Sequence, residues 1–173
     1  WVLGDWRLDP DAAIRSGFGS FMDVSHNGRV GNTVTINGRV PSELRVRAGE
    51  PIRLRLINAA SARVFSLRFT DHRPQVIALD GQRVEPHETE GGAIVLGPAM
   101  RADLILDVIG QPRARYIVQD DFYRGLSYEL ITLTYSDEPP VRSRPTEAVV
   151  LPPNPLSEPD LRPSDTRWSS RAG

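Results

Sequence analysis

Apolar and polar residues alternate along residues 33–108 with the period of two that β-strands produce. Within this segment, Arg53 and Arg55 alternate with apolar neighbours, so one side of the strand is charged and the other is apolar. This pattern is typical of a sheet that rests one face on a hydrophobic core. The segment therefore predicts β-structure with a buried side.

Short apolar or alternating runs continue along the chain, and turn residues such as Asn37-Gly38 and Asp80-Gly81 separate them. These runs predict about nine or ten strands. We expect a Greek-key sandwich or barrel, because an open parallel sheet would need helices between its strands. We expect two adjacent runs, 44–48 and 51–58, to pair like a hairpin. The predicted strands lie at residues 1–3, 33–36, 44–48, 51–58, 64–69, 75–79, 93–96, 102–108, 115–119 and 128–135.

The alternation also predicts which side chains face the core. Two strands give the clearest inward sets, which are Phe65, Leu67 and Phe69, and Leu104, Leu106 and Val108. Asp103 and Asp107 then lie on an outer face, roughly 13 Å apart at about 3.3 Å per residue, too far for a shared proton. We expect them to pair with arginines of a neighbouring strand.

The two ends of the chain differ from this pattern. Asp9 followed by Pro10 predicts a cap and one or two helical turns over 9–15. Residues 17–22 predict a loop that packs Phe18 and Phe21 on the core, because no strand precedes them as a phosphate-binding glycine loop requires.

Proline density defines the C-terminal end. After Asp137 the composition becomes rich in proline and charged residues, which prevents regular structure and predicts a tether. We therefore expect a β-domain over 1–137 and a proline-rich linker over 138–173. The chain begins without Met, inside an expected strand, so we expect it to be a piece of a longer protein.

Composition excludes several classes of site. The chain has no cysteine, so a disulfide, a thiolate zinc site, a cysteine nucleophile and a blue-copper centre are all ruled out. Its net charge of −1 and the absence of a basic stripe make nucleic acid an unexpected partner. No apolar run approaches the roughly 20 residues that span a bilayer, so we expect no membrane contact.

Candidate chemistry is sparse, and we expect no catalytic, cofactor or metal residue. The three histidines lie in separate loops without paired spacing, so His72, His87 and Glu88 or Glu90 make a weak metal candidate against hydrogen-bonded loop histidines. No Gly-x-Ser-x-Gly motif occurs, so a serine nucleophile is not indicated. The third histidine is His26, which lies in a turn. Ser61, Ser66 and Ser127 lack the sequence context of a nucleophile. We expect Trp1, Trp6 and Trp168 to be core or interdomain anchors.

One acidic pair leaves two interpretations open. Asp120 and Asp121 precede an aromatic loop, Phe122-Tyr123-Arg124-Gly125. The favoured interpretation is a pair of solvated turn residues, and the other is a pair that borders a substrate pocket.

Several motifs, taken in order, resemble the middle, copper-free cupredoxin-like domain of three-domain multicopper oxidases of the laccase-like kind. The resemblance covers about residues 1–137, except that 17–29 align with no family motif. The motifs are Ile36-Asn37-Gly38, Arg-Leu-Arg-Leu-Ile-Asn at 53–58, Val-Ile-Ala-Leu-Asp-Gly at 76–81 followed by Val84 and Pro86, and Gly-Pro-Ala-Met-Arg-Ala-Asp-Leu-Ile-Leu at 97–106.

This resemblance implies a structural role between two copper-bearing domains of a periplasmic or secreted parent, beside the substrate cleft. The parent would oxidise a phenol, an amine or a metal ion by one-electron steps and reduce oxygen to water, with every copper ligand outside this chain. An exposed apolar patch that includes Trp1 or Phe122, and self-association of the isolated chain, would follow. The alternative is a self-standing immunoglobulin-like binding module, which lacks support because neither a Cys-Trp-Cys core nor an aromatic strip is present.

Overall fold

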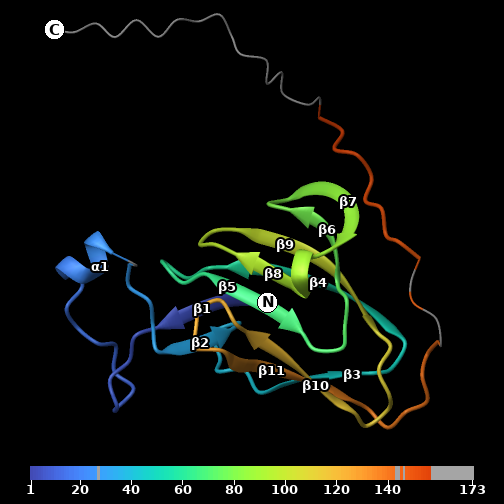
Figure 1. The fold of residues 1–173 in the computed structure, drawn as a ribbon, viewed down its shortest axis with the longest axis horizontal. Coiled ribbons are helices and arrows are strands. Elements are labelled where there is room, and N and C mark those ends of the chain that lie inside the picture. Colours follow the sequence, from blue (N-terminus) through green and yellow to red (C-terminus); the bar gives the residue numbers. More distant parts are fainter. Residues whose placement is uncertain (27, 143–144, 146, 157–173) are drawn as a thin grey trace, which may run out of the picture.

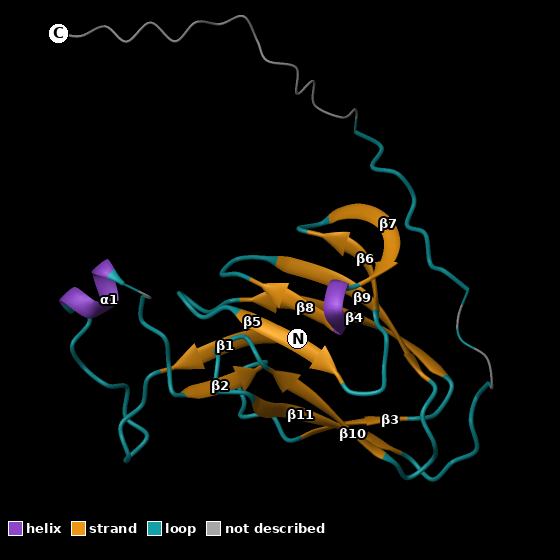
Figure 2. Cartoon of the chain, in the orientation of Figure 1, coloured by secondary structure: helices purple, strands orange, loops and turns teal. Residues whose placement is uncertain are grey.

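Two β-sheets packed on one core make up this computed structural model, which describes residues 1–26, 28–142, 145 and 147–156 (Figure 1). From edge to edge, the larger sheet contains β2 (Thr33–Ile36), β1 (Val2–Trp6), β4 (Glu50–Asn58), β9 (Arg101–Val108), β6 (Gln75–Leu79) and β7 (Gln82–Glu88). The smaller contains β3 (Glu43–Val46), β11 (Tyr128–Tyr135), β10 (Arg115–Asp120), β5 (Phe65–Phe69) and β8 (Ala93–Leu96). The expected all-β sandwich is confirmed (Figure 2).

The core lies between the sheets, where the predicted inward positions meet. In the larger sheet Leu54 pairs in register with Leu104, and both are buried. Phe65 and Leu67 of β5 approach from the smaller sheet and are fully buried. The two predicted inward sets are confirmed, since Phe65, Leu67, Phe69, Leu104, Leu106 and Val108 all belong to the core.

The outer face of β4 and β9 carries the predicted charge pairs. Asp103 Oδ2 lies 2.5 Å from Arg53 Nη2, and its Oδ1 lies 3.5 Å from Arg55 Nε of the neighbouring strand. Asp107 instead pairs at 2.6 Å with Arg142, which follows the last strand. The expectation of a neighbouring-strand arginine is therefore confirmed for Asp103 and wrong for Asp107.

The expected pairing of residues 44–48 with 51–58 is wrong. β3 joins the smaller sheet, parallel to β11, whereas β4 lies in the larger sheet between β1 and β9. A turn separates them, in which Glu50 N donates to Arg47 O and Gly49 has a φ of +82°. The glycine permits this left-handed backbone, so the chain changes sheets at this point.

The helix expected over 9–15 is also wrong. Asp11 Oδ1 accepts a hydrogen bond from Ala13 N, and Ala12 has a φ of +64°, so the segment forms a tight reversal that brings Leu8 opposite Ile14. A local side-chain bond of this kind competes with helical hydrogen bonds.

The short helix lies later, in the segment that we call the arm, residues 10–26. Helix α1 (Phe21–Ser25) begins where Ser20 Oγ accepts from Asp23 N. Phe18 and Phe21 are 71% and 76% exposed, so the expectation that they pack on the core is wrong. The arm projects from one end of the sandwich, beyond β1 and β2 (Figure 1).

One strand was not predicted. The described residues form eleven strands, one more than the ten predicted runs, and the additional strand is β7. β7 is mostly polar and contains Pro86, which an edge strand tolerates since its outer side needs no ladder partner. A 3₁₀ turn, η1 (Glu90–Gly92), precedes β8.

We call the two-sheet sandwich the body. The first residues after Asp137 follow its surface, and we call residues 138–142 the strap. Val141 N donates to Ala48 O at 2.8 Å, and Arg47 pairs with Glu138 at 2.7 Å. A side chain on Gly49 would collide with the backbone of Arg142. The strap leaves the sandwich at the end opposite the arm (Figure 1).

Candidate functional site

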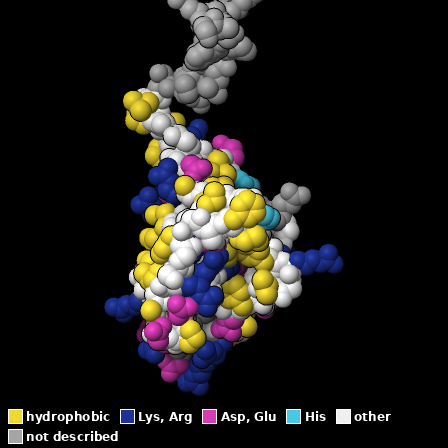
Figure 3. Space-filling view, turned by 90° about the vertical axis from the view of Figure 1, so that its left-hand side faces the viewer, with side chains coloured by type: hydrophobic (Ala, Val, Ile, Leu, Met, Phe, Trp, Pro, Cys, Tyr) yellow, Lys and Arg dark blue, Asp and Glu magenta, His cyan; other side chains and the backbone are white. Residues whose placement is uncertain are grey.

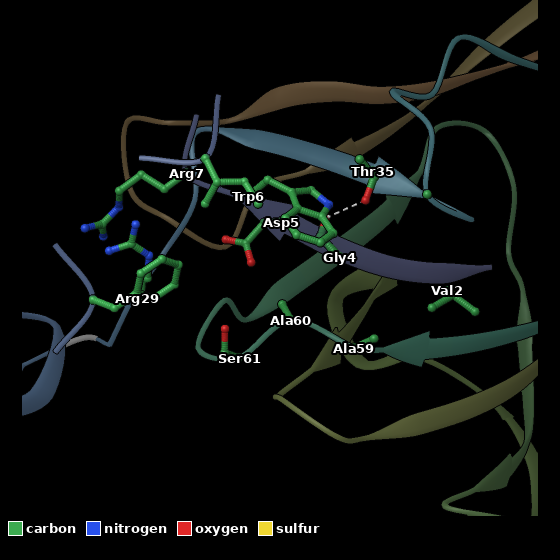
Figure 4. A pocket seen from close by; sticks show the side chains of 13 residues that line it. Val2, Gly4, Asp5, Trp6, Arg7, Arg29, Thr35, Ala59, Ala60 and Ser61 are labelled. Atoms are coloured by element: carbon green, nitrogen blue, oxygen red, sulfur yellow. Dashed lines mark hydrogen bonds between the residues drawn. The ribbon is translucent and has the colours of Figure 1, made fainter. Parts of the chain in front are cut away.

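A pocket of about 380 Å³ opens beside β1, where the strand meets the arm and the turn after β4. β1 directs Val2, Gly4 and Trp6 to its outer face, since alternate residues share a face. Gly4 adds no side chain to the floor, and Thr35 of the paired strand β2 lies opposite it. Figure 4 shows the indole of Trp6 beside Thr35 and the Asp5 carboxylate turned toward Ser61.

The arm forms one wall of this pocket. Ile14 and Phe18 line it, and the Arg29 guanidinium lies 4.1 Å from the centre of the Phe18 ring. Such a distance is within the range of a cation–π contact. The pocket thus combines an exposed indole, arginine side chains and a nearby carboxylate.

Asp5 begins a set of buried charges beneath the pocket. Its Oδ2 accepts hydrogen bonds from Arg63 Nε at 3.1 Å and from Gly31 N. Arg63 Nη2 also donates to Gly31 O at 2.8 Å, which clamps the chain before β2. Only a glycine allows this approach, since a Cβ at Gly31 would overlap the backbone of Trp6. Asp5 Oδ1 is buried and has no hydrogen-bond partner among the described residues.

Asp120 completes this set, and we call Asp5, Arg63 and Asp120 the buried ion network. Asp120 Oδ2 lies 3.9 Å from Arg63 Nη1 and accepts the Tyr128 hydroxyl at 2.8 Å. Its Oδ1 accepts Ser66 N at 3.0 Å. Burial, together with the Asp120 charge, raises the pKa of Tyr128 well above its usual range. The network therefore joins β1 of one sheet to β10 of the other.

The favoured interpretation of Asp120 and Asp121 as solvated turn residues is wrong. The Asp120 side chain is 1% exposed. Asp121 accepts Ser66 Oγ at 2.6 Å and Arg68 Nε at 2.7 Å. The Ser66 hydrogen bond, helped by Arg68, outweighs partial burial and lowers the pKa of Asp121. Both carboxylates have partners because Asp120 ends β10 and Asp121 follows it, where the chain lies beside Ser66 of the neighbouring strand β5.

The histidines remain apart. Buried His72 is within hydrogen-bond distance of the Tyr135 hydroxyl through Nε2 at 2.6 Å and of Thr70 O through Nδ1 at 2.7 Å. His87 is exposed and lies against Glu85 O, and His26 lies in the arm beside Ser25. Within the described ranges no three histidine or acidic side chains come together as metal ligands.

The donor set does not fit a type 1 copper, because the sequence has no cysteine to supply the thiolate. No step of copper chemistry can therefore be assigned to these residues. Among the described residues, no helix has the length and apolarity needed to cross a bilayer.

The tryptophans and serines take different roles. Trp1 stacks on Phe69 at 6.4 Å and packs against the core, whereas Trp6 is 48% exposed in the pocket. Ser61 also lines the pocket, and Ser127 lines a separate recess near Tyr128. Trp168 lies outside the described residues.

Sequence reasoning missed Asp5 and Arg63. A signal existed for Asp5, because it shares the inward face of its strand with Leu3, and a carboxylate at an inward position needs a buried partner. The partner could not be named, since Arg63 lies 58 residues away in a loop.

The family model for multicopper oxidase matches residues 1–135. Among curated proteins, the chain is 30% identical over 107 residues to cell division protein FtsP of Edwardsiella tarda, covering 62% of this chain and 21% of that protein. It is 25% identical over 184 residues to laccase-15 of Oryza sativa, covering 99% of this chain and 30% of that protein.

A solved structure is also similar to this chain. The multicopper oxidase of Pseudomonas thermotolerans is similar with a TM-score of 0.78 and 29% identity, covering 92% of this chain and 37% of that one. The chain therefore spans between about a fifth and two fifths of the length of these relatives.

Proposed function

Because this chain belongs to the multicopper oxidase family, we propose that it is the middle domain of an oxidase and spaces two copper-bearing domains of the same parent chain. The observation that carries this proposal is a family match over residues 1–135 in a sequence without cysteine. The sequence has no cysteine for a type 1 copper and no His-x-His pair, so the copper ligands would lie in the rest of the parent. Its own contribution is then structural.

We propose the parent reaction by resemblance to the family. The oxidase takes single electrons from a phenol, an amine or a metal ion and reduces oxygen to water, and copper in the flanking domains supplies this redox chemistry. We place the parent in the periplasm or outside the cell on the same ground of resemblance. The isolated 173-residue chain would have no oxidase activity.

We further propose that the pocket beside β1 borders the substrate cleft. Trp6 offers an exposed aromatic face on a rigid strand, and Arg7 and Arg29 reach the same opening (Figure 4). Aromatic faces and arginine side chains suit an aromatic or anionic organic reductant. The buried ion network beneath holds this wall in place, because it fixes both β1 and the turn before β2.

Two experiments test this proposal. The coding sequence of the parent should contain His-x-His motifs on both sides of this chain, and unrelated flanking modules would contradict the middle-domain role. In the parent, Trp6→Ala should raise KM for an aromatic reductant more than it lowers kcat. Val95→Ala on the edge strand β8, also exposed, is the matched control and should change neither constant.

A second candidate rests on the similarity to FtsP. A parent of that kind would act in cell division. The copper content of the purified parent separates the two candidates, because only the oxidase requires a type 1 and a trinuclear centre.

A further inference from the structure

The arm places large apolar side chains in solvent. None of its apolar residues is buried, although the arm lies against a body that has a well-formed core. Burial of such side chains stabilises a protein, so leaving a group of them exposed needs an explanation. The exposed apolar residues are Ile14 (55%), Phe18 (71%), Phe21 (76%), Met22 (61%) and Val24 (74%).

These side chains are held in place and do not sit on a loose loop. Asp23 of α1 pairs with Arg7 of the body at 2.8 Å and with Arg29 at 3.0 Å, and its side chain is only 7% exposed. Burial alone raises the pKa of Asp23, but the hydrogen bonds from Arg29 and Arg7 outweigh it, so the net pKa is lowered. Arg29 also donates to Arg15 O, which ties the start of the arm to the same anchor.

The exposed group is continuous with the pocket beside β1, because Ile14 and Phe18 belong to both. Figure 3 views this end of the molecule and shows hydrophobic side chains around a hollow that contains basic side chains. Large apolar side chains exposed together on one surface are typical of a site that another protein covers.

The size of the surface favours a tethered partner. Five apolar side chains on one short segment are few compared with the roughly 20–30 residues a side of a stable interface between separate proteins. A domain linked through the same chain binds at a high effective concentration and needs less contact. Most of each relative lies outside the region matched by this chain, so the parent has residues to supply such a domain.

We propose that the arm is a docking surface on which a flanking domain of the same parent closes over the rim of the pocket beside β1. This inference rests on the proposed middle-domain function. The anchored Asp23 fixes the position of α1, and the five apolar side chains become buried when the flanking domain seats.

Methionine oxidation tests the proposal, because the chain has one methionine in the arm and one in the body. Met22 is 61% exposed, whereas Met100 packs against the core and its sulfur lies 3.2 Å from Gly97 N. Dilute hydrogen peroxide and peptide mass spectrometry give the ratio of the two oxidation rates, with Met100 as the internal reference. In the 173-residue chain Met22 should react much faster than Met100.

In the intact parent, the ratio should fall severalfold because the flanking domain covers Met22. An unchanged ratio would overturn the docking proposal. So would slow oxidation of Met22 already in the dilute 173-residue chain, because another element would then cover the arm. The copper content of the same parent sample tests the proposed function separately. If the parent contains copper and the ratio of Met22 to Met100 oxidation is unchanged, only the docking proposal is contradicted.

Substitutions give a second measurement. Phe21→Ser combined with Val24→Ser should lower the thermal midpoint of the parent and restore Met22 oxidation, yet leave the midpoint of the 173-residue chain unchanged. Val95→Ser combined with Ile109→Ser, which are exposed apolar positions outside the arm, is the control and should change neither protein. Equal effects of both pairs on the parent would contradict a specific docking surface.

Discussion

The body and the arm both depend on aspartate–arginine pairs, but they use them in opposite settings. In the body, Arg63 and Asp5 are 10% and 1% exposed and lie beneath a pocket between apolar layers. In the arm, Asp23 joins Arg7 and Arg29 while the apolar side chains point outward. The body is therefore stabilised by its own interior, whereas the arm is a fixed surface that buries the Asp23 carboxylate but none of its large apolar side chains.

The largest expected effect comes from breaking the buried ion network. Arg63→Ala should lower the free energy of unfolding by about 3–5 kcal/mol, because it leaves two buried carboxylates without their cation. Arg55→Ala removes an exposed partner of Asp103 and should cost about 0–1 kcal/mol. Urea denaturation of both variants measures the difference, and equal losses would show that burial does not distinguish these pairs.

Removing the strap should have a smaller effect. Truncation after Asp137 removes the Arg142–Asp107 pair and the Val141–Ala48 hydrogen bond, so we expect a loss of about 1–2 kcal/mol. Truncation after Arg142 keeps both contacts and should leave stability unchanged. Thermal denaturation measures the stability of the two truncated chains. A loss above about 3 kcal/mol for the shorter chain would mean that residues after Asp137 pack into the body as an integral part.

Alkaline pH should weaken the body through Tyr135. Burial raises the pKa of Tyr135 to about 12, above an unfolded value of about 10. The stability linked to this raised pKa is present below about pH 10 and is lost as the pH rises toward 12. Tyr135→Phe should flatten the fall in unfolding free energy over this range. If the Tyr135→Phe variant loses unfolding free energy with pH as steeply as the unaltered chain, Tyr135 is not the source of the alkaline loss.

Changes in the arm should have the smallest effect on stability. In the 173-residue chain, Phe21→Ser with Val24→Ser should alter the unfolding free energy by less than about 0.5 kcal/mol, since both side chains are exposed. The same variant should weaken the self-association that we expect at high concentration. Light scattering measures the mass, and association that is unaffected by the variant would place the contact elsewhere, for example at Trp1 or Phe122.

Much of the body could be predicted from the sequence because alternation is a local signal. The inward sets of β5 and β9 follow directly from it, and so does the pairing of Asp103 with arginine across β4. β7 was missed because an edge strand has little to bury and so carries little alternation.

The remaining features depend on long-range contacts. The chain moves between sheets at Gly49, and no pattern near this glycine shows that β3 pairs with β11 about 90 residues away. Asp120 was expected to be solvated since its partner Arg63 is distant in sequence. The arm was misjudged for another reason. Phe18 and Phe21 indicate burial, but a sequence does not tell whether the cover comes from the same domain.

Copper analysis of the parent and of the 173-residue chain tests the central claim most directly. We predict that the parent contains a type 1 and a trinuclear copper centre, whereas the 173-residue chain shows no blue charge-transfer band and binds Cu(II) or Cu(I) only weakly. A parent without copper would contradict the oxidase and favour a role like that of FtsP. Tight stoichiometric copper binding by the chain itself, abolished by His72→Ala, would contradict a copper-free middle domain.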